Sequence, residues 1–425
     1  MQKVLIITYY WPPSGGPGVQ RILKFVKYLP EFGWEPVILT VKNGEYPVID
    51  EALQDEVSPG LKVYRSKSYE PFNFYKFITG KSKKEKIPKH AISKAGDEKL
   101  TQKISRLIRA NFFIPDARVG WVKSIESAGI GIIEKEKPSV ILSTSPPHSL
   151  QLGAKRLADK SGLKWVADLR DPWTDAYWMK DIGRIRAARS IDRKFERDVV
   201  NRADEVIVVS NSLIKNYRDT GRSDFHVLPN GFDEDDFKDL EKRESDKFRI
   251  LYAGGMSTSQ NPVKFFEAVN QLEDGIKQIL DINFYGSFHS SIIDSIRGNN
   301  LSSLVQIHDY IPHSEAIKKM ADAELLLLTI PDVPNNEGII TGKFFEYLAT
   351  RNFILTVGPE KGDVAAILEE TGSGRVVDFN EDPSNILLHE IERWKSNGKM
   401  HINEDALKKY SRRSTTQKLS QILSE

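Results

Sequence analysis

The residues best suited to bind a ligand lie in the stretch NNEGIITGKFFEYLATRNFILTVG, residues 335–358. Gly338 and Gly342 free the backbone just before a predicted helix that starts near Lys343. The first N–H groups of a helix have no partner within it, so with the Lys343 ammonium they form a site for a diphosphate. Glu346 lies one turn inside the helix, where its carboxylate can accept hydrogen bonds from a ribose diol. The alternative for Glu346 is a solvated helix residue, but its neighbours Phe345 and Leu348 favour a buried face nearby.

A glycine-rich loop follows the first apolar run, in VLIITYYWPPSGGPGVQRILKF, residues 4–25. Gly15, Gly16 and Gly18 let a ligand approach the backbone, and the N–H groups of the following helix start favour an anionic or polar ligand. The alternative is a tight turn that needs positive φ. GGPGVQR lacks the spacing of the dinucleotide-binding fingerprint, so a nicotinamide-dependent oxidoreductase is disfavoured.

Polar residues also follow two other apolar runs of the first half. STSPPHS, residues 143–149, places His148 where its ring can bond a sugar hydroxyl or the transferred group; the alternative is a loop histidine that caps backbone groups. ADLRDPW, residues 167–173, places Asp168, Arg170 and Asp171 at the end of a run, where they either line a cleft or pair with one another. In the second half, LYAGG (251–255, with Gly254 and Gly255) and YGSF (285–288) end apolar runs on glycine.

Short apolar runs, each followed by a helix-period segment, recur along the 425 residues and must position these loops. Their continuous hydrophobicity predicts strands buried on both faces, as in doubly wound parallel sheets, and the length predicts two such α/β domains. Ligands of such sheets bind at the carboxyl ends of the strands. The expected strands are 4–10, 37–41, 140–143, 165–169 and 206–209, then 249–253, 282–285, 325–330 and 353–357.

The domain limits follow from a polar, charged stretch at residues 230–247, NGFDEDDFKDLEKRESDK. We expect a first domain at 1–232, a second at 233–403, and a C-terminal helix at 404–425 that packs back across the first. The acidic run at 233–236 is interpreted as solvated linker rather than as a metal site.

Composition excludes several classes of protein. The net charge of +2 gives no overall nucleic-acid signature, and the absence of cysteine excludes disulfides, thiol catalysis and thiolate metal sites. The N-terminus reads as a strand rather than a signal peptide, and no apolar stretch has the length to span a bilayer. We expect a cytoplasmic chain.

A basic insert interrupts the first domain, at about residues 66–115. Residues 80–109 carry ten basic and three acidic residues, a local charge of +7. Apolar residues then recur at helical spacing, at Leu100, Ile104, Leu107, Ile108 and Phe112. One interpretation is a solvated loop followed by a core-facing helix; the other is a segment, residues 80–112, that rests on an anionic membrane at the inner face of the cell membrane and meets a lipid-linked acceptor.

Taken in order, six stretches resemble the retaining glycosyltransferases of the GT-B fold, family 4, over almost the whole chain. They are ITYYWPPSGGPGVQRILKFVKYLPEFGWEPVILT, IPDARVGW, STSPPHS, DLRDPW, LPNGFDEDDF and GKFFEYLA. The resemblance implies two Rossmann-like domains facing a central cleft, with a nucleotide-sugar donor on the second and an acceptor on the first. It also implies a hexosyltransferase without a metal cofactor that acts on a glycan or lipid-linked acceptor, in surface polysaccharide or glycolipid biosynthesis.

The resemblance also assigns roles by position. Gly15, Gly16 and Gly18 match the loop that lies against the donor phosphate and the transferred sugar, with Gly16 and His148 near the reaction centre. The helix start matches the phosphate-facing segment and Glu346 the ribose-binding glutamate. The candidate catalytic residues are therefore His148, Lys343 and Gly16. The candidate donor-binding residues are Gly15, Gly18, Gly254, Gly255, Glu337, Gly338, Thr341, Gly342 and Glu346, and the candidate acceptor-side residues are Asp168, Arg170 and Asp171.

The sequence departs from the family pattern in two places. Eight residues separate Glu337 from Glu346, one more than is common, so Glu337 serves only if its loop bulges. Gly255 and Gln260 stand where an Arg and a Lys often clamp the diphosphate, so charge neutralisation falls to Lys343 and the helix start. The alternative function is therefore a GT-B-shaped protein that binds a sugar nucleotide with little or no transfer.

Overall fold

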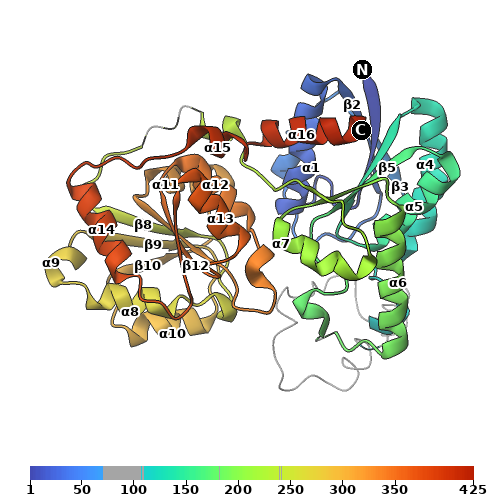
Figure 1. Cartoon of the computed structure of the whole chain (residues 1–425). Coiled ribbons are helices and arrows are strands. Elements are labelled where there is room, and N and C mark those ends of the chain that lie inside the picture. The colour runs from blue at the N-terminus through green and yellow to red at the C-terminus, as the bar shows by residue number, and fades with distance from the viewer. Residues whose placement is uncertain (70–106, 108–109, 181, 239, 241) are drawn as a thin grey trace. The chain divides into compact units, whose positions relative to one another are not determined.

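The computed structural model describes residues 1–69, 107, 110–180, 182–238, 240 and 242–425. The chain forms two compact units (Figure 1). The first unit comprises residues 1–229 and 416–425, and the second comprises residues 230–415. Each contains a parallel sheet covered by helices on both faces, which confirms the predicted fold class of two Rossmann-like domains.

The first unit contains a seven-stranded sheet in the order β3-β2-β1-β4-β5-β6-β7. All neighbouring strands pair in parallel. The strands are β1 (Gln2–Thr8), β2 (Trp34–Val41), β3 (Lys62–Ser66), β4 (Val140–Ser145), β5 (Lys164–Leu169), β6 (Glu205–Val208) and β7 (His226–Val227). The five central strands are the five that the sequence predicts in this half.

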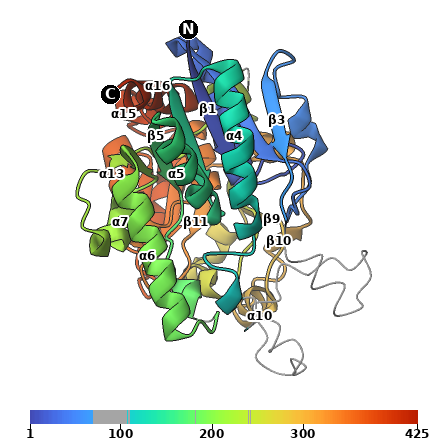
Figure 2. The same ribbon diagram turned by 90° about the vertical axis from the view of Figure 1, so that its right-hand side faces the viewer.

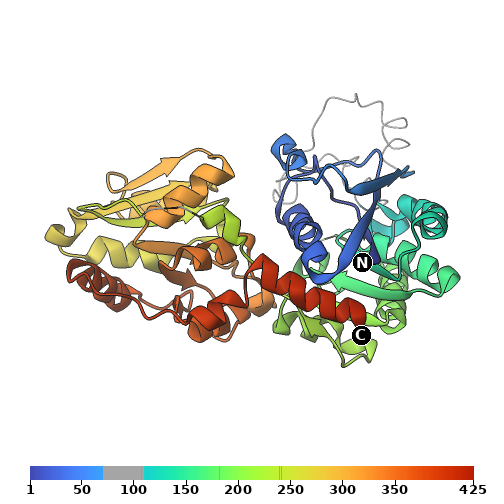
Figure 3. The ribbon, with the colours of Figure 1, turned by 90° about the horizontal axis from the view of Figure 1, so that it is seen from above.

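Helices cover both faces of this sheet. The helices are α1 (Pro17–Tyr28), α4 (Val122–Glu136), α5 (Ser149–Ser161), α6 (Arg186–Arg202), α7 (Asn211–Ile214) and α16 (Arg412–Ser424). Apolar residues of α4, α5 and α6 pack on one face, where Figure 2 shows α4 and α5 in front of the strands. On the other face, Leu419, Ile422 and Leu423 of α16 (red in Figure 3) share a buried cluster with Val19 and Ile22 of α1.

The second unit contains a six-stranded parallel sheet in the order β10-β9-β8-β11-β12-β13. Its strands are β8 (Phe248–Ala253), β9 (Leu280–Tyr285), β10 (Val305–His308), β11 (Leu325–Thr329), β12 (Phe353–Val357) and β13 (Gly374–Val377). Helices α8 (Val263–Gln271), α10 (Ser290–Gly298) and α14 (Ser384–Lys395) cover one face. Helices α11 (His313–Asp322), α12 (Gly342–Thr350), α13 (Asp363–Thr371) and α15 (Glu404–Lys408) contribute to the core on the other, and α9 spans Asp274–Lys277.

The polypeptide crosses between the units at two points. The first crossing follows Pro229, within three residues of the limit expected from the sequence. The segment expected as one helix at 404–425 forms two, and only its last ten residues, from Thr416, belong to the first unit. Within the described residues, no helix combines the length and the apolar character that a membrane span requires. The expected basic insert lies largely outside the described residues.

Candidate functional site

In the first unit, His148 lies just beyond the carboxyl end of β4, as the first residue before α5. The Asp116 carboxylate fixes this point, because it accepts hydrogen bonds from the Ser149 backbone N–H (2.9 Å) and from the Ser149 hydroxyl (2.7 Å). A carboxylate at a helix N-terminus is favoured by the helix dipole. The first turn of α5, and with it the backbone of His148, is therefore held against the segment that carries Asp116.

The imidazole of His148 stacks on the indole of Trp173, with 4.8 Å between ring centroids and 13° between planes. Its Nδ1 is buried and has no hydrogen-bond partner among the described residues. Burial lowers the pKa of His148 below its usual value of 6.5, although Asp116, Asp171 and the Pro172 carbonyl act in the opposite direction. The ring is therefore neutral near pH 7 and can exchange a hydrogen bond with a ligand.

The glycine-rich loop before α1 lies at the same edge of the sheet. A Cβ on Gly18 would lie 2.4 Å from Nη1 of Arg170, so glycine at this position leaves room for the guanidinium. Arg170 Nε donates to the Ser145 carbonyl (3.0 Å) and Nη2 to the Pro146 carbonyl (3.4 Å). Burial lowers the pKa of Arg170, against the influence of Asp168 and Asp171. The structure thus brings Gly18 together with Arg170 and the loop of His148. Gly15 instead lies against Val48 and Asp50, and a Cβ on Gly16 would meet no atom of the described residues within 4 Å.

Asp168 does not face this edge, which corrects its assignment to the acceptor side. Its carboxylate is buried and accepts hydrogen bonds from Arg21 Nε (3.1 Å), Arg21 Nη2 (2.9 Å) and the Thr144 hydroxyl (2.8 Å). Arg21 also donates to the carbonyls of Leu228 and Pro229. Asp168 is therefore a structural residue that joins β5, β4 and α1. Asp171 is partly exposed, and its carbonyl accepts from the Tyr217 hydroxyl.

In the second unit, Lys343 lies in the first turn of α12, at the carboxyl end of β8. Its Nζ donates to the Tyr252 hydroxyl (2.8 Å) and lies 4.1 Å from the centroid of that ring. Gly254 follows β8 with φ of 114°, and a Cβ there would lie 2.8 Å from Lys343 Nζ. The ammonium therefore rests against the backbone of Gly254, where a side chain on residue 254 would not fit.

The start of α12 offers further polar groups. Thr341 is the N-cap residue, but its side chain makes no capping hydrogen bond, and its Oγ1 is buried without a partner among the described residues. The Ala253 N–H donates to the Tyr347 hydroxyl (2.9 Å), which ties α12 to the end of β8. Thr341, Gly342, Lys343 and Gly254 are thereby held at one point, and an unsatisfied hydroxyl beside helix N–H groups suits a polyoxyanion.

The remaining predicted donor residues surround this point less closely. Glu346 Oε1 lies 3.0 Å from His313 Nε2 of α11, so its carboxylate is partnered and partly exposed. Glu337 and Gly338 form a short 3₁₀ turn, Asn336–Gly338, and no hydrogen bond of the Glu337 side chain occurs within the described part of the chain. The carbonyl of Gly255 accepts from the Tyr252 hydroxyl.

Gln260, at one of the positions where a cation was expected, has a structural role. Its Oε1 accepts from the Ser257 N–H and hydroxyl, and its Nε2 donates to the Thr329 carbonyl. The loop after β8 is therefore closed by an amide rather than presenting a charge. Lys343 therefore remains the candidate cation of this site.

Three residues of the site were not predicted. Tyr252 holds Lys343, Asp116 holds the start of α5, and Trp173 carries the His148 ring. Tyr252, Asp116 and Trp173 all fall within the stretches LYAGG, IPDARVGW and DLRDPW, but only the fold shows what each contacts. A tyrosine two residues before a glycine pair at a strand end, Tyr252 before Gly254, was the one available signal.

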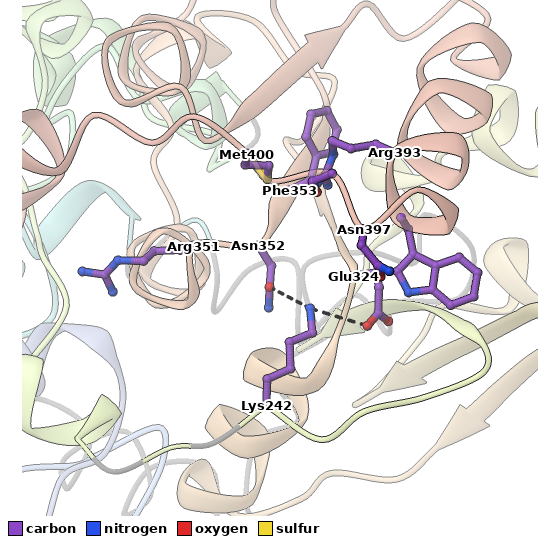
Figure 4. A pocket seen from close by; sticks show the side chains of 10 residues that line it. Lys242, Glu324, Arg351, Asn352, Phe353, Arg393, Asn397 and Met400 are labelled. Carbon is purple, nitrogen blue, oxygen red and sulfur yellow. Dashed lines mark hydrogen bonds and ion pairs between the residues drawn. The ribbon is translucent and has the colours of Figure 1, made fainter.

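A pocket of 260 Å³ lies at the other edge of the second sheet, where β11 and β12 begin (Figure 4). Lys242 Nζ donates to the Ala323 carbonyl (2.8 Å) and to Asn352 Oδ1 (3.1 Å), and pairs with Glu324 at 3.5 Å. Burial lowers the pKa of Lys242. Arg393 at the pocket wall pairs with Glu390. Lys242 and Arg393 both pair with carboxylates of the protein itself, so we do not assign the candidate site to this pocket.

The chain is similar to known proteins in both sequence and fold. The sequence profile described as Glycosyltransferase Family 4 matches residues 18–236. No curated protein sequence matches the chain. Solved structures match over nearly the whole length of both chains at low identity, and each of these likenesses shows the fold alone.

Three of those structures illustrate the range. A glycosyltransferase from Rickettsia africae has a TM-score of 0.64 at 12% identity, covering 100% of this chain and 98% of the other. TarM of S. aureus, solved with UDP and α-GlcNAc-glycerol, has a TM-score of 0.60 at 11% identity, covering 100% of both chains. A sucrose-phosphate synthase from Thermosynechococcus elongatus has a TM-score of 0.59 at 14% identity, covering 100% and 95%.

Proposed function

The chain belongs to Glycosyltransferase Family 4 and is a nucleotide-sugar glycosyltransferase, and we propose that it is a retaining enzyme that transfers a hexosyl unit to a glycan or lipid-linked acceptor. We place the reaction in the assembly of a surface polysaccharide or glycolipid. The observation that carries the proposal is the Lys343 ammonium held against Gly254 beside the unsatisfied Thr341 hydroxyl.

This arrangement suits the charge changes of glycosyl transfer. The bond between the anomeric carbon and the diphosphate oxygen breaks while the bond to the acceptor oxygen forms, so negative charge grows on the departing diphosphate. Lys343, the Thr341 hydroxyl and the first N–H groups of α12 would stabilise that charge, as groups fixed before the reaction do most effectively. Glu346 would accept hydrogen bonds from the ribose of the donor.

The first unit would supply the groups around the transferred sugar. We assign a hydrogen bond with the sugar to the neutral His148 ring, and close backbone approach to Gly15, Gly16 and Gly18. The acceptor hydroxyl would lose its proton to the departing diphosphate on the same face of the sugar, which retains the anomeric configuration. No pair of catalytic carboxylates of the glycosidase type is then required.

We further propose that transfer needs no resident metal ion, since Lys343 and the helix start already provide positive charge at the diphosphate. Among the described residues, a His and carboxylate group with the spacing of a metal site consists of Glu205, His226 and Glu425. β6 and β7 begin at Glu205 and His226, so this group lies at the amino ends of the strands, away from the candidate site.

A donor screen followed by a substitution tests the phosphate role. Thermal shift of the full chain with a panel of nucleotide sugars identifies the donor, because a ligand that binds only the native state raises the melting temperature. Lys343→Met is then expected to lower turnover by about 10²–10³-fold while stability changes by about 1 kcal/mol. Lys264→Met is the matched control, because Lys264 on α8 pairs with Glu267 at the surface. Unchanged turnover in Lys343→Met would refute the assignment.

The same material separates the proposal from its alternative, a protein that binds the sugar nucleotide without transfer. The use of Gln260 in loop closure, where a cation was expected, favours that alternative. Incubation with the donor and a panel of acceptors, followed by NMR of the anomeric proton, gives three outcomes. A product with the donor's configuration supports the proposal, an inverted product excludes retention, and binding without transfer or hydrolysis supports the alternative.

We also propose that the enzyme meets its acceptor on an anionic membrane surface, at the cytoplasmic face of the cell membrane. Segment 80–112 lies largely outside the described residues, but Leu107 and Phe112 are described and exposed. Asn111 links this segment to exposed Ile185, since it bonds the Ile185 N–H and the Gly183 carbonyl. The adjoining helix α6 has exposed basic residues at helical spacing, which are Arg186, Arg189, Arg193 and Arg197. Apolar residues beside a basic stripe suit an anionic interface.

Vesicle flotation tests the membrane proposal. The full chain is expected to float with vesicles that contain anionic lipid and not with neutral ones, and Arg186→Glu/Arg189→Glu is expected to abolish flotation. The control Lys318→Glu/Lys395→Glu makes the same charge change at exposed positions of the second unit. An equal loss of flotation in both variants would show that only the net charge of the protein matters. If the wild type does not float, the membrane proposal is wrong.

A further inference from the structure

We infer that Trp173 is a positioning residue for His148, and that two carboxylates of α6, Asp192 and Glu196, hold the Trp173 loop in place. The inference rests on the proposed function, in which His148 contacts the transferred sugar. It begins from the stacked contact of the two rings, 4.8 Å between centroids and 13° between planes. A parallel contact at this distance fixes the plane of the imidazole.

The indole itself cannot turn freely. Trp173 is buried, and its Nε1 donates to Asp192 Oδ1 (2.8 Å). Asp192 is buried as well and pairs through its other oxygen with Arg184. Arg184 Nε donates in turn to the Ala110 carbonyl (3.1 Å). Rotation of the indole would leave a buried carboxylate oxygen without its donor, which is unfavourable.

The residue after Trp173 is held by the same helix. Glu196, one turn along α6 from Asp192, accepts from the Thr174 N–H (3.0 Å) and the Thr174 hydroxyl (2.7 Å). On the other side of Trp173, the Asp171 carbonyl accepts from the Tyr217 hydroxyl (2.9 Å). The loop that carries Trp173 is therefore fixed at three points, Asp171, Trp173 and Thr174.

His148 needs such support because its Nδ1 contributes no hydrogen bond, within the described part of the chain, that would hold the ring. Nδ1 is buried without a hydrogen-bond partner among the described residues, so no hydrogen bond from that nitrogen sets the ring orientation. Asp116 fixes the backbone of α5 but not the ring. The charged groups around the imidazole are Asp116, Asp171 and Arg170, and burial outweighs them in lowering the pKa of His148. Removing the indole would admit water to one face of the ring and raise that pKa.

Histidine-selective NMR of the full chain tests this directly. The chain has eight histidines, and the His148 resonance is assigned by its loss in His148→Gln. Trp173→Leu is expected to raise the His148 pKa toward the ordinary value of about 6.5, whereas Trp173→Phe keeps an aromatic face and the low pKa. Trp165→Leu is the matched control, because Trp165 is also buried in the first unit, with Nε1 bonded to Ser143 Oγ (2.7 Å).

A milder substitution tests the hydrogen bond between Thr174 and Glu196 of α6. Thr174→Val removes the hydroxyl that donates to Glu196 and keeps the side-chain shape, so the His148 pKa is expected to rise by a smaller amount. This variant also serves if Trp173→Leu does not fold. An unchanged His148 titration in Trp173→Leu, or an equal shift in Trp165→Leu, overturns the positioning role, and no shift in Thr174→Val overturns the role of α6.

A kinetic measurement separates this inference from the proposed function. With the donor found by thermal shift, Trp173→Leu is expected to lower kcat at least tenfold with little change in KM. Wild-type turnover of His148→Gln would refute the role of His148 in transfer, while the NMR result on Trp173 would stand. A kcat of Trp173→Leu equal to that of the wild type would overturn the inference alone.

Discussion

The substitution Asp168→Asn distinguishes a structural role for this residue from the ligand-facing role that its sequence position indicates. Asp168 is 1% exposed and its partner Arg21 is 0% exposed, so the change removes a carboxylate charge that pairs with a buried guanidinium. Removing one partner of a buried pair costs about 3–5 kcal/mol. Asn is the same size and leaves no cavity, and Arg21 keeps its bonds to the carbonyls of Leu228 and Pro229. We therefore expect the low end, about 3 kcal/mol.

Tryptophan fluorescence during denaturation follows the affected unit. Six of the seven tryptophans lie in the first unit, and Trp394 alone lies in the second. For a unit of this size, about 3 kcal/mol corresponds to a fall of about 6–12 °C in melting temperature. The control is Lys155→Ala, which removes an exposed pair with Asp159 and is expected to change stability by less than about 0.5 kcal/mol.

One result would refute the reasoning. If Asp168→Asn lost less than about 1 kcal/mol while transfer to an acceptor collapsed, Asp168 would act on the ligand and not within the core. A loss of stability accompanied by normal turnover of the remaining folded protein would agree with the buried pair.

Three further predictions concern charge and space at the site. Burial raises the pKa of Glu196 to about 7 from 4.5, so the folded state binds the proton more tightly and the first unit loses stability as pH rises from about 4.5 to 7. In denaturation curves, Glu196→Gln should remove about 2–3 kcal/mol of this decline between pH 5 and 8. An unaltered pH profile would contradict this prediction. Gly254→Ala should destabilise the second unit by about 1–3 kcal/mol, displace Lys343 and lower turnover. In the same thermal-denaturation measurements, Gly275→Ala should be neutral, because a Cβ on residue 275 meets nothing within 4 Å in the described structure. Gly18→Ala should push Arg170 from its place and lower turnover more than stability, and equal turnover would show that Arg170 tolerates the shift.

The sequence predicted the interior of both sheets and missed their edges. The nine expected strands correspond to the nine central strands, from β1 to β12, which are buried on both faces and therefore continuously apolar. The four strands that were not predicted within the described chain, β3, β7, β10 and β13, are the edge strands of the two sheets. Their residues are largely half-exposed or exposed, so their composition resembles that of loops.

For the candidate site, spacing along the chain located the right loops but not the partners of each side chain. Lys343 and Gly254 stand far apart in sequence and meet only because α12 packs on the end of β8. Asp168 and Arg170 are two residues apart at the end of a strand, but their side chains lie in different places. Asp168 lies inside the core, and Arg170 lies at the edge of the sheet. Asp168 is held in the core by Arg21, a residue that local pattern does not connect to it.

The return of the last ten residues to the first unit has a consequence for biosynthesis. Leu419, Ile422 and Leu423 complete the buried cluster on the α1 face of that unit, and a ribosome adds them after the whole of the second unit. N-terminal domains generally fold first during synthesis, but the apolar surface on the α1 face of this one stays uncovered until these residues have been made. A product that stops before Thr416 would carry that surface permanently, so the loss of this short segment would leave the buried cluster of the first unit incomplete.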